Sequence, residues 1–123
     1  MAIGAKVIDL PLHVDARGRL TVFEGGMEVP FQIKRVFVIS DVPRHSVRGQ
    51  HAHRRCQQVL VAVAGGVTVR VNDAQDYRLS RSENALYLPA GAFVEMRDWT
   101  PDAVLMVLAS ERYDPEDYVR RDE

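Results

Sequence analysis

Two histidines one residue apart, His51 and His53, are the side chains of this sequence with the clearest potential for chemistry. They lie in the stretch RGQHAHRRCQQVLV, residues 48–61. An imidazole titrates near neutral pH, so it can carry a proton between atoms of a substrate, and its neutral form also binds metal ions. A pair of strand histidines without a chemical role is the third interpretation. Which of these three interpretations applies depends on the secondary structure that positions the pair. It also depends on the other metal-binding side chains that the chain offers.

Short apolar or alternating runs separated by turn residues recur along the chain. The main runs are KVIDL, LTVFE, IKRVFVIS, QVLVAV, VTVRV, ALYL and AVLMVLAS. Their spacing, with β-branched residues in most of them, predicts an all-β fold built as an antiparallel sandwich or barrel. Helical periodicity is weak, and only the tail DPEDYVRR, residues 114–121, hints at a helix.

Two of these runs predict how their strands are buried. In VTVRVN, Val67, Val69 and Val71 fall on one face of an extended strand. QVLVAV is apolar on both faces, which is typical of a central strand covered on both sides. The histidine pair enters this second run from its N-terminal side. Side chains two residues apart share a face of a strand, so His51 and His53 project into one cavity if that face is the interior.

Composition indicates an ordinary soluble domain. Of 123 residues, 46% are hydrophobic and 27% are charged, which predicts one globular domain spanning residues 1–123. The 16 Lys and Arg nearly balance the 17 Asp and Glu, so charge gives no sign of a nucleic-acid partner. The single cysteine, Cys56, fits a reduced setting. Without a secretory leader pattern or an apolar run of membrane-spanning length, we expect a cytoplasmic protein with no membrane partner.

The metal hypothesis can be tested against the motifs of cupin barrels. There, His-x-His is followed after about four residues by Glu, and a later Pro-x-Gly-x-x-His supplies a third imidazole. This chain keeps both frames, but Gln58 occupies the Glu position and Val94 the late His position. An amide is a weak neutral ligand and valine is none, so two imidazoles alone would not hold a metal tightly. The sequence predicts no metal, and the two cupin frames favour acid/base chemistry over histidines without a role.

With these residues in view, the chain resembles the nucleotide-sugar 3,4-ketoisomerases, small cupin enzymes of deoxysugar biosynthesis. The resemblance implies a single-domain all-β cupin, an RmlC-like jelly roll, that forms a homodimer with exchanged N-terminal strands. The matching segments cover nearly the whole length and are DARGRLTVFE, PFQIKRVFVISDV, RGQHAHRRCQQVLV, LYLPAGAFVEM and AVLMVLASERYDPEDYVR.

The resemblance implies a substrate of the type dTDP-4-keto-6-deoxyglucose. Its carbonyl would move from C4 to C3, giving a dTDP-3-keto-6-deoxyhexose, with no metal or redox cofactor. A base removes the C3 proton, which the neighbouring ketone acidifies, and the resulting enediol is reprotonated at C4. His51 matches the R-G-x-H position whose histidine serves as base in the related sugar-nucleotide 3,5-epimerases. It is therefore the expected base, with His53 beside it for proton relay or orientation. Arg48, Gln58 or a tyrosine could stabilise the enediolate oxygen.

The diphosphate of such a substrate needs cations. By resemblance the candidates are Arg17 of the DARG element, Arg35 and Arg48. Arg17 could reach the site of a neighbouring subunit. Glu24 is a weaker candidate for contact with the nucleotide end.

Two departures from the family pattern keep other hypotheses open. Members usually carry WHEM where this chain has FVEM, so Phe93 and Val94 replace Trp and His. Tyrosines are also common where this chain has Phe37 and Val38, which removes one possible acid. A cupin that binds a sugar nucleotide without turning it over is therefore the main alternative. A 3,5-epimerase, which normally needs a longer chain and an opposed tyrosine, and a scaffold without any ligand are less favoured.

Overall fold

The computed structural model describes residues 4–81 and 84–120. Within them lie twelve strands and one short 3₁₀ helix. In chain order these are β1 (Lys6–Asp9), β2 (Leu12–Asp15), β3 (Gly18–Thr21), β4 (Arg35–Ser40), β5 (Arg48–His53), β6 (Gln58–Ala64), β7 (Gly66–Val71), β8 (Gln75–Ser80), β9 (Asn84–Leu88), β10 (Val94–Arg97), β11 (Val104–Ala109), η1 (Pro115–Asp117) and β12 (Tyr118–Arg120).

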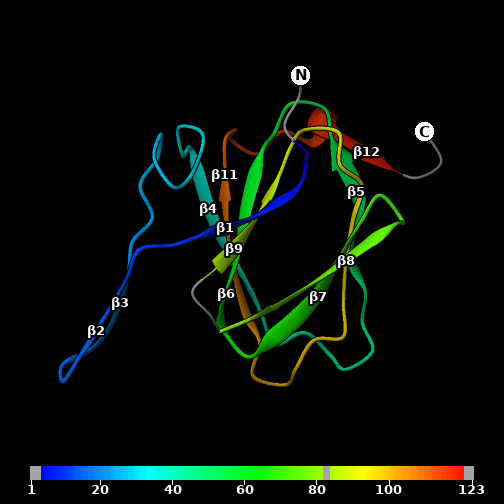
Figure 1. Cartoon of the computed structure of the whole chain (residues 1–123). Coiled ribbons are helices and arrows are strands. Elements are labelled where there is room, and N and C mark those ends of the chain that lie inside the picture. Colours follow the sequence, from blue (N-terminus) through cyan, green and yellow to red (C-terminus); the bar gives the residue numbers. More distant parts are fainter. Residues whose placement is uncertain (1–3, 82–83, 121–123) are drawn as a thin grey trace.

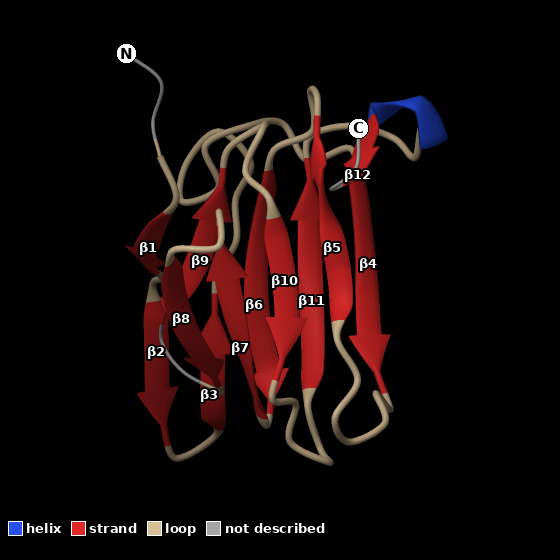
Figure 2. Cartoon of the chain, turned by 90° about the vertical axis from the view of Figure 1, so that its right-hand side faces the viewer, coloured by secondary structure: helices blue, strands red, loops and turns tan. Residues whose placement is uncertain are grey.

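Ten of the strands form two five-stranded antiparallel sheets that face each other (Figures 1 and 2). The first sheet has the order β1-β9-β6-β11-β4, and the second has the order β12-β5-β10-β7-β8. Among the described residues no hydrogen-bonded strand pair joins the two sheets, so they form a sandwich rather than a closed barrel. The prediction of an all-β antiparallel sandwich is confirmed.

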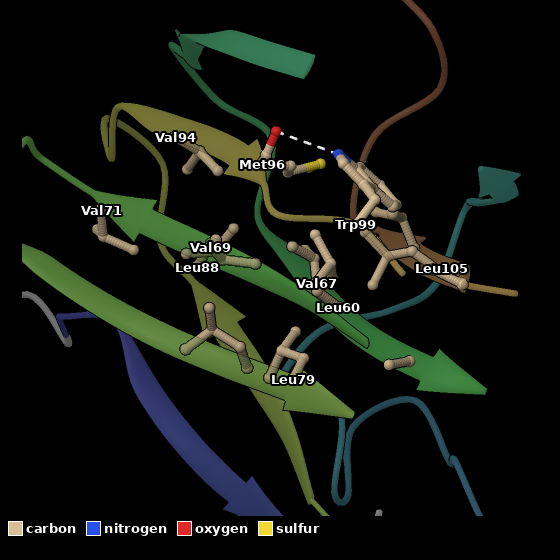
Figure 3. Packing of buried hydrophobic residues seen from close by; sticks show 14 of the residues in the cluster. Leu60, Val67, Val69, Val71, Leu79, Leu88, Val94, Met96, Trp99 and Leu105 are labelled. Carbon is tan, nitrogen blue, oxygen red and sulfur yellow. Dashed lines mark hydrogen bonds between the residues drawn. The ribbon is translucent and has the colours of Figure 1, made fainter. Parts of the chain in front are cut away.

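The core between the sheets comes from the alternating runs that the sequence predicts. Val67 and Val69 of β7 are buried against Leu60 of β6, and the other face of β7 is only partly covered (Figure 3). Trp99 closes one end of this core, and its indole Nε1 donates to the carbonyl of Met96 at 3.2 Å. Complete burial of a leucine- or valine-sized side chain stabilises a fold by about 1.5–3 kcal/mol, so this cluster is a main source of stability.

The central strand β6 is buried on both faces, as its continuous apolar run predicts. Leu60 points toward the second sheet, while Val59 and Val61 belong to a separate cluster on the outer face of the first sheet. The loop between β3 and β4 covers that outer face with Val29 and Phe31. Alternate residues of β6 thus pack in two different cores.

The strands β2 and β3 form a hairpin that extends away from the sandwich (Figure 1). Val14 and Leu20 on this hairpin are 66% and 60% exposed. At its turn, Arg17 Nη2 pairs with Asp15 Oδ2 over 2.6 Å. The hairpin therefore presents apolar side chains and a guanidinium away from the rest of its own chain.

The tail does not form the helix at which its sequence hints. Pro115–Asp117 is a single 3₁₀ turn, and the chain then enters β12, which pairs with β5. The turn starts with an Asp114 side chain that accepts from the backbone N–H of Glu116, and proline follows as the first residue of the turn. In the described part of the chain, no helix has the length and apolar character needed to cross a bilayer.

A β-bulge in β5 determines which of its side chains face the interior. His51 lies opposite Val94 of β10, but the next residue of β10 lies opposite Gly49, so Gln50 is the extra residue of the bulge. Gly49 and Gln50 both have positive φ angles, 84° and 60°. The extra residue shifts the alternation of side chains by one position. Arg48 therefore shares a face with His51, although three positions separate them.

We expect Gly49→Ala to destabilise the protein more than Gly91→Ala. Both glycines have a left-handed backbone, with φ of 84° and 88°, but a Cβ at Gly49 would lie 2.8 Å from the Val94 carbonyl oxygen, whereas Gly91 has open space. Gly91→Ala should cost about 1–2 kcal/mol for its backbone conformation, and Gly49→Ala about 1–3 kcal/mol more for the clash. Urea unfolding of both variants measures the difference, and equal losses would contradict the close contact.

Candidate active site

A cavity of about 200 Å³ lies between the two sheets. Strands β5, β10 and β12 of the second sheet supply one wall, and β4, β6 and β9 of the first sheet supply the wall that faces it. The cavity is thus built from strands that are far apart in the sequence, from β4 to β12.

Both histidines of the sequence pair line this cavity. His51 and His53 lie on β5, where the two-residue spacing predicts a common face, and the bulge precedes the pair without separating it. Their ring centroids are 4.9 Å apart, with the ring planes nearly perpendicular at 86°. Two imidazoles therefore approach any molecule in the cavity from the same wall.

A hydrogen bond to the backbone fixes the tautomer of His51. Its Nδ1 lies 2.9 Å from the carbonyl oxygen of Gly49. A carbonyl only accepts hydrogen bonds, so Nδ1 carries the hydrogen and Nε2 keeps its lone pair. The Gly49 carbonyl, which precedes the bulge residue Gln50, thus holds His51 in the form that can act as a base.

Burial keeps both imidazoles neutral. It lowers the pKa of His53 to about 4, aided by the neighbouring His51, while Asp117 acts in the opposite direction. Burial also lowers the pKa of His51, partly offset by its hydrogen bond to Gly49. His53 is only 7% exposed, and its Nε2 has no hydrogen-bond partner among the described residues. Near pH 7 both rings are therefore uncharged, and the cavity holds one buried imidazole nitrogen without a partner.

Tyr118 completes a cluster of three rings. Its ring centroid lies 4.7 Å from that of His51 and 4.6 Å from that of His53, and it also lines the cavity. On β12 it lies opposite His53 of β5. The sequence led us to expect an unspecified tyrosine near the enediolate but did not single out this one, because the tail reads as a possible helix although it forms a strand. The alternating Tyr-Val-Arg that follows the Asp-Pro turn is the signal that could have found it.

Asp117 anchors the tail that carries this tyrosine. Its carboxylate accepts from the backbone N–H groups of Arg55, at 2.7 Å, and Cys56, at 3.2 Å. Its backbone carbonyl accepts from the N–H of Arg54 at 2.8 Å. The Asp117 side chain is 3% exposed, so these bonds are shielded from water. Together they fix the start of β12 on the loop that follows β5.

The wall that faces the imidazoles is mostly apolar. Phe37 and Ile39 of β4 and Leu88 of β9 line it, together with one amide, Gln58 of β6. Val94 lines the cavity beside His51 on the neighbouring strand, at the position where the family motif has histidine. Its replacement of that histidine therefore makes the site itself more apolar.

Some of the residues predicted to bind substrate line the cavity, and others lie elsewhere in the chain. Arg48 and Gln58 line the cavity. Arg35 lies outside the lining, with its guanidinium 5.1 Å from the ring centre of Phe37 and 5.7 Å from that of Tyr113. Its charge nonetheless lowers the pKa of His53, and its buried Nε has no hydrogen-bond partner in the described residues.

The structure does not bring Arg17 or Glu24 to this cavity within one chain. Arg17 is exposed at the tip of the β2–β3 hairpin. Glu24 is exposed in the loop that follows this hairpin, and its backbone N–H donates to the Glu28 carboxylate at 3.1 Å.

Metal-binding side chains do not gather around the histidines. Across residues 4–81 and 84–120, no group of three His, Cys, Asp or Glu side chains lies close enough together to hold a metal ion. The cavity instead presents the amide of Gln58 and the valine at position 94, as the sequence motifs indicate.

Comparison with known proteins shows which family this chain belongs to. Residues 3–123 match the family described as FdtA, WxcM-like, C-terminal. The chain belongs to this family. The resemblance to sugar 3,4-ketoisomerases, which the sequence motifs indicate, is confirmed. The proteins to which the chain is related are isomerases.

Relatives of this FdtA-family chain are similar over almost their full length. The TDP-4-oxo-6-deoxy-alpha-D-glucose-3,4-oxoisomerase of Aneurinibacillus thermoaerophilus is 40% identical over 119 residues, which are 94% of this chain and 86% of the relative. A double mutant of the QdtA 3,4-ketoisomerase from Thermoanaerobacterium thermosaccharolyticum, solved with TDP, has a TM-score of 0.93 and 37% identity, covering 99% and 91% of the two chains. The WlaRB TDP-quinovose 3,4-ketoisomerase from Campylobacter jejuni has a TM-score of 0.91 and 36% identity, covering 96% and 93%. This agreement confirms the cupin jelly roll.

We expect Asp117→Ala to destabilise this FdtA-family protein by about 2–4 kcal/mol, because two buried N–H groups lose a charged acceptor. Activity of the folded variant should fall as well, since the tyrosine that follows is no longer held over the histidines. Glu116→Ala alters an exposed side chain of the same turn and should change stability by less than about 0.5 kcal/mol. Urea unfolding and turnover of both variants test this, and similar losses in the two would argue against an anchoring role.

Proposed function

We propose that this chain is a sugar-nucleotide 3,4-ketoisomerase. It converts dTDP-4-keto-6-deoxyglucose to a dTDP-3-keto-6-deoxyhexose by metal-independent proton transfer through an enediol. The observation that carries the proposal is the pair of neutral imidazoles on one wall of a largely apolar cavity, in a chain 40% identical to a named 3,4-oxoisomerase. We assign the activity to a single domain, residues 1–123, in the cytoplasm, where the lone buried Cys56 stays reduced.

His51 is the catalytic base in this proposal. Its Nδ1–H is held by the Gly49 carbonyl, so Nε2 is free to take the proton from C3 of the sugar. A neutral imidazole is required for this step, and burial favours the neutral form. His53, the second inward imidazole, relays a proton between the sugar oxygens or orients His51.

Neighbouring groups stabilise the charge that develops on the enediolate. Arg48, Gln58 and Tyr118 line the same cavity, and each can donate a hydrogen bond to an oxygen at C3 or C4. In a cavity partly shielded from solvent, the attraction between such donors and a negative oxygen is stronger than in water.

Two arginines in or near the sugar cavity bind the diphosphate in this proposal. Arg48 extends from the cavity to the surface, and Arg35 lies nearby against two aromatic rings. In this proposal Glu24 contacts the nucleotide end of the substrate. Guanidinium groups suit phosphate oxygens because they can bind two of them at once.

The protein acts as a homodimer with exchanged N-terminal strands in this proposal. The protruding β2–β3 hairpin, with exposed Val14 and Leu20, supports it, as do Val36 and Val38, which are exposed on β4. In the dimer, the hairpin of one subunit would carry Arg17 to the diphosphate in the site of the other.

The reaction is tested by incubating the protein with dTDP-4-keto-6-deoxyglucose in D₂O and following the sugar by NMR. The ketone should move to C3, with deuterium from solvent entering at C4. His51→Asn should lower the rate by about 10²–10⁴-fold, the usual contribution of a well-placed acid/base group. His45→Asn is the matched control, because His45 is exposed and has a left-handed backbone that asparagine tolerates.

Two results would contradict the proposed reaction or its base. Broadening of the ligand signals without exchange or ketone migration would show a sugar-nucleotide-binding protein rather than an enzyme. Equal activity of the His51→Asn and His45→Asn variants would show that another group removes the proton.

Exchange of the hairpin between subunits is tested by mixing two variants. Arg17→Ala and His51→Asn chains, refolded together at equal amounts, should recover about a quarter of the native activity, because half of the dimers are hybrids with one intact site each. The control mixes Arg17→Ala with the double variant, in which no hybrid site is intact. Activity that stays at the mean of the two parents would place Arg17 outside the partner's site.

A further inference from the structure

The loop that follows β5 contacts the tail of the chain through a side chain as well as through its backbone. Besides the backbone bonds to Asp117, the guanidinium of Arg55 donates from Nη2 to Asp114 Oδ2 at 2.8 Å. Its Nε lies 3.6 Å from Asp117 Oδ1, and its Nη1 lies 3.7 Å from Glu111 Oε1. One guanidinium thus faces three carboxylates, which lie before the 3₁₀ turn η1, at its start and at its end.

Asp114 uses its two carboxylate oxygens for two different contacts. Oδ1 accepts from the backbone N–H of Glu116 at 3.0 Å and so caps the turn. Oδ2 accepts from the guanidinium of Arg55. Both bonds are charge-assisted and end on one side chain, so the turn cannot shift along the loop without breaking one of them.

Tyr118 follows this turn directly. Its backbone N–H donates to the carbonyl of Pro115, and its ring lies 4.7 Å from that of His51 and 4.6 Å from that of His53, measured between centroids. The position of the turn therefore sets the position of the ring. All of these contacts lie within one chain, so no partner subunit is needed to form them.

Arg55 is too exposed to be a main source of stability. Its side chain is 58% exposed, and ion pairs so open to solvent contribute little to the free energy of unfolding. The shielded bonds of Asp117 attach the tail without it. What the guanidinium adds is direction, because its N–H groups form a rigid planar fork.

We propose that Arg55 is a positioning residue for the cluster of three rings. By holding Asp114 it places the 3₁₀ turn so that the ring of Tyr118 packs on His51 and His53. This inference rests on the proposed ketoisomerase function, in which Tyr118 donates to the enediolate. Arg55 does not line the cavity and acts through the tail.

Displacement of the tyrosine ring should affect catalysis more than substrate binding. A donor stabilises an enediolate best when it is in place before the charge develops. A misplacement of about 1 Å can lower a rate by about 10²-fold, and partial loosening of the turn should lower it by about 10-fold. Loss of Arg55 should therefore lower kcat with little change in KM, whereas loss of a diphosphate ligand would raise KM.

The test compares Arg55→Gln with Asp114→Asn and with Arg112→Gln. Asparagine at position 114 keeps an oxygen that can cap the turn but has no charge for Arg55. Arg112 is an exposed arginine on the same surface groove, and in the described part of the chain no ion pair joins it to Asp114. It is therefore the matched control for loss of one positive charge.

Two measurements are made on each protein. Initial rates of ketone migration in dTDP-4-keto-6-deoxyglucose give kcat and KM. Proton NMR of the imidazole C–H groups reports the contact with the tyrosine, because a nearby aromatic ring shifts their resonances. Tyr118→Leu gives the shift for complete loss of the ring, and the His51→Asn and His53→Asn variants assign the signals.

Arg55→Gln and Asp114→Asn should each lower kcat by about 10-fold and change KM by less than about twofold. Both should move the imidazole signals toward those of Tyr118→Leu, and Arg112→Gln should do neither. The double variant Arg55→Gln/Asp114→Asn should be no slower than the slower single variant, because both substitutions break the same contact.

Several outcomes would overturn the inference. A raised KM with unchanged kcat in Arg55→Gln would assign the guanidinium to substrate binding. Equal losses in Arg55→Gln and Arg112→Gln would show an effect of surface charge alone, and unchanged imidazole signals in Arg55→Gln would show that the ring does not depend on it. If Arg55→Gln does not fold, the same measurements on Asp114→Asn decide the question.

Failure of the proposed function is distinguishable from failure of the inference. Absence of ketone migration with the unaltered protein would overturn the proposed function, and a positioning role in that reaction with it. Ketone migration by the unaltered protein together with unchanged kcat in Arg55→Gln would overturn the inference alone.

Discussion

The backbone of Gly49 passes so close to the Val94 carbonyl that a Cβ would lie only 2.8 Å from its oxygen. This contact allows the bulge at Gln50, and the bulge turns Arg48 toward the face that carries the histidines. The carbonyl of Gly49 also holds the Nδ1–H of His51. One left-handed segment thereby determines the register of β5, the tautomer of its first histidine and the position of a guanidinium.

The chemistry of the cavity depends on a low-dielectric environment. Burial disfavours charge on His51 and His53, so both rings stay neutral, the form in which an imidazole nitrogen can accept a proton. The same burial leaves His53 Nε2 without a hydrogen-bond partner among the described residues, which costs stability. Such costs are typical of functional sites, where activity and stability make different demands. The core that contains Leu60 of β6 and the valines of β7 supplies the stability that offsets this cost.

The sequence predicts the strands and the common face of the histidines, because both follow from apolar runs and from the period of two. It does not predict the bulge, since positive φ at Gly49 and Gln50 arises from packing against β10. The sequence also suggests a helix at the position where β12 carries Tyr118. The reason is that an Asp-Pro pair followed by acidic residues occurs both in short turns and at the start of helices. Arg17 is a candidate only by resemblance, because within one chain it is exposed on a protruding hairpin and does not line the cavity.

The wall of three rings joins β5 to β12, and so it joins the middle of the sequence to its end. The hydrogen bonds that anchor β12 join residues 62 and 61 positions apart. Contacts of such long sequence separation form only after a large loop has closed, which costs conformational entropy. The cluster of three rings therefore depends on the topology of the whole sandwich, and no local segment of the chain can assemble it alone.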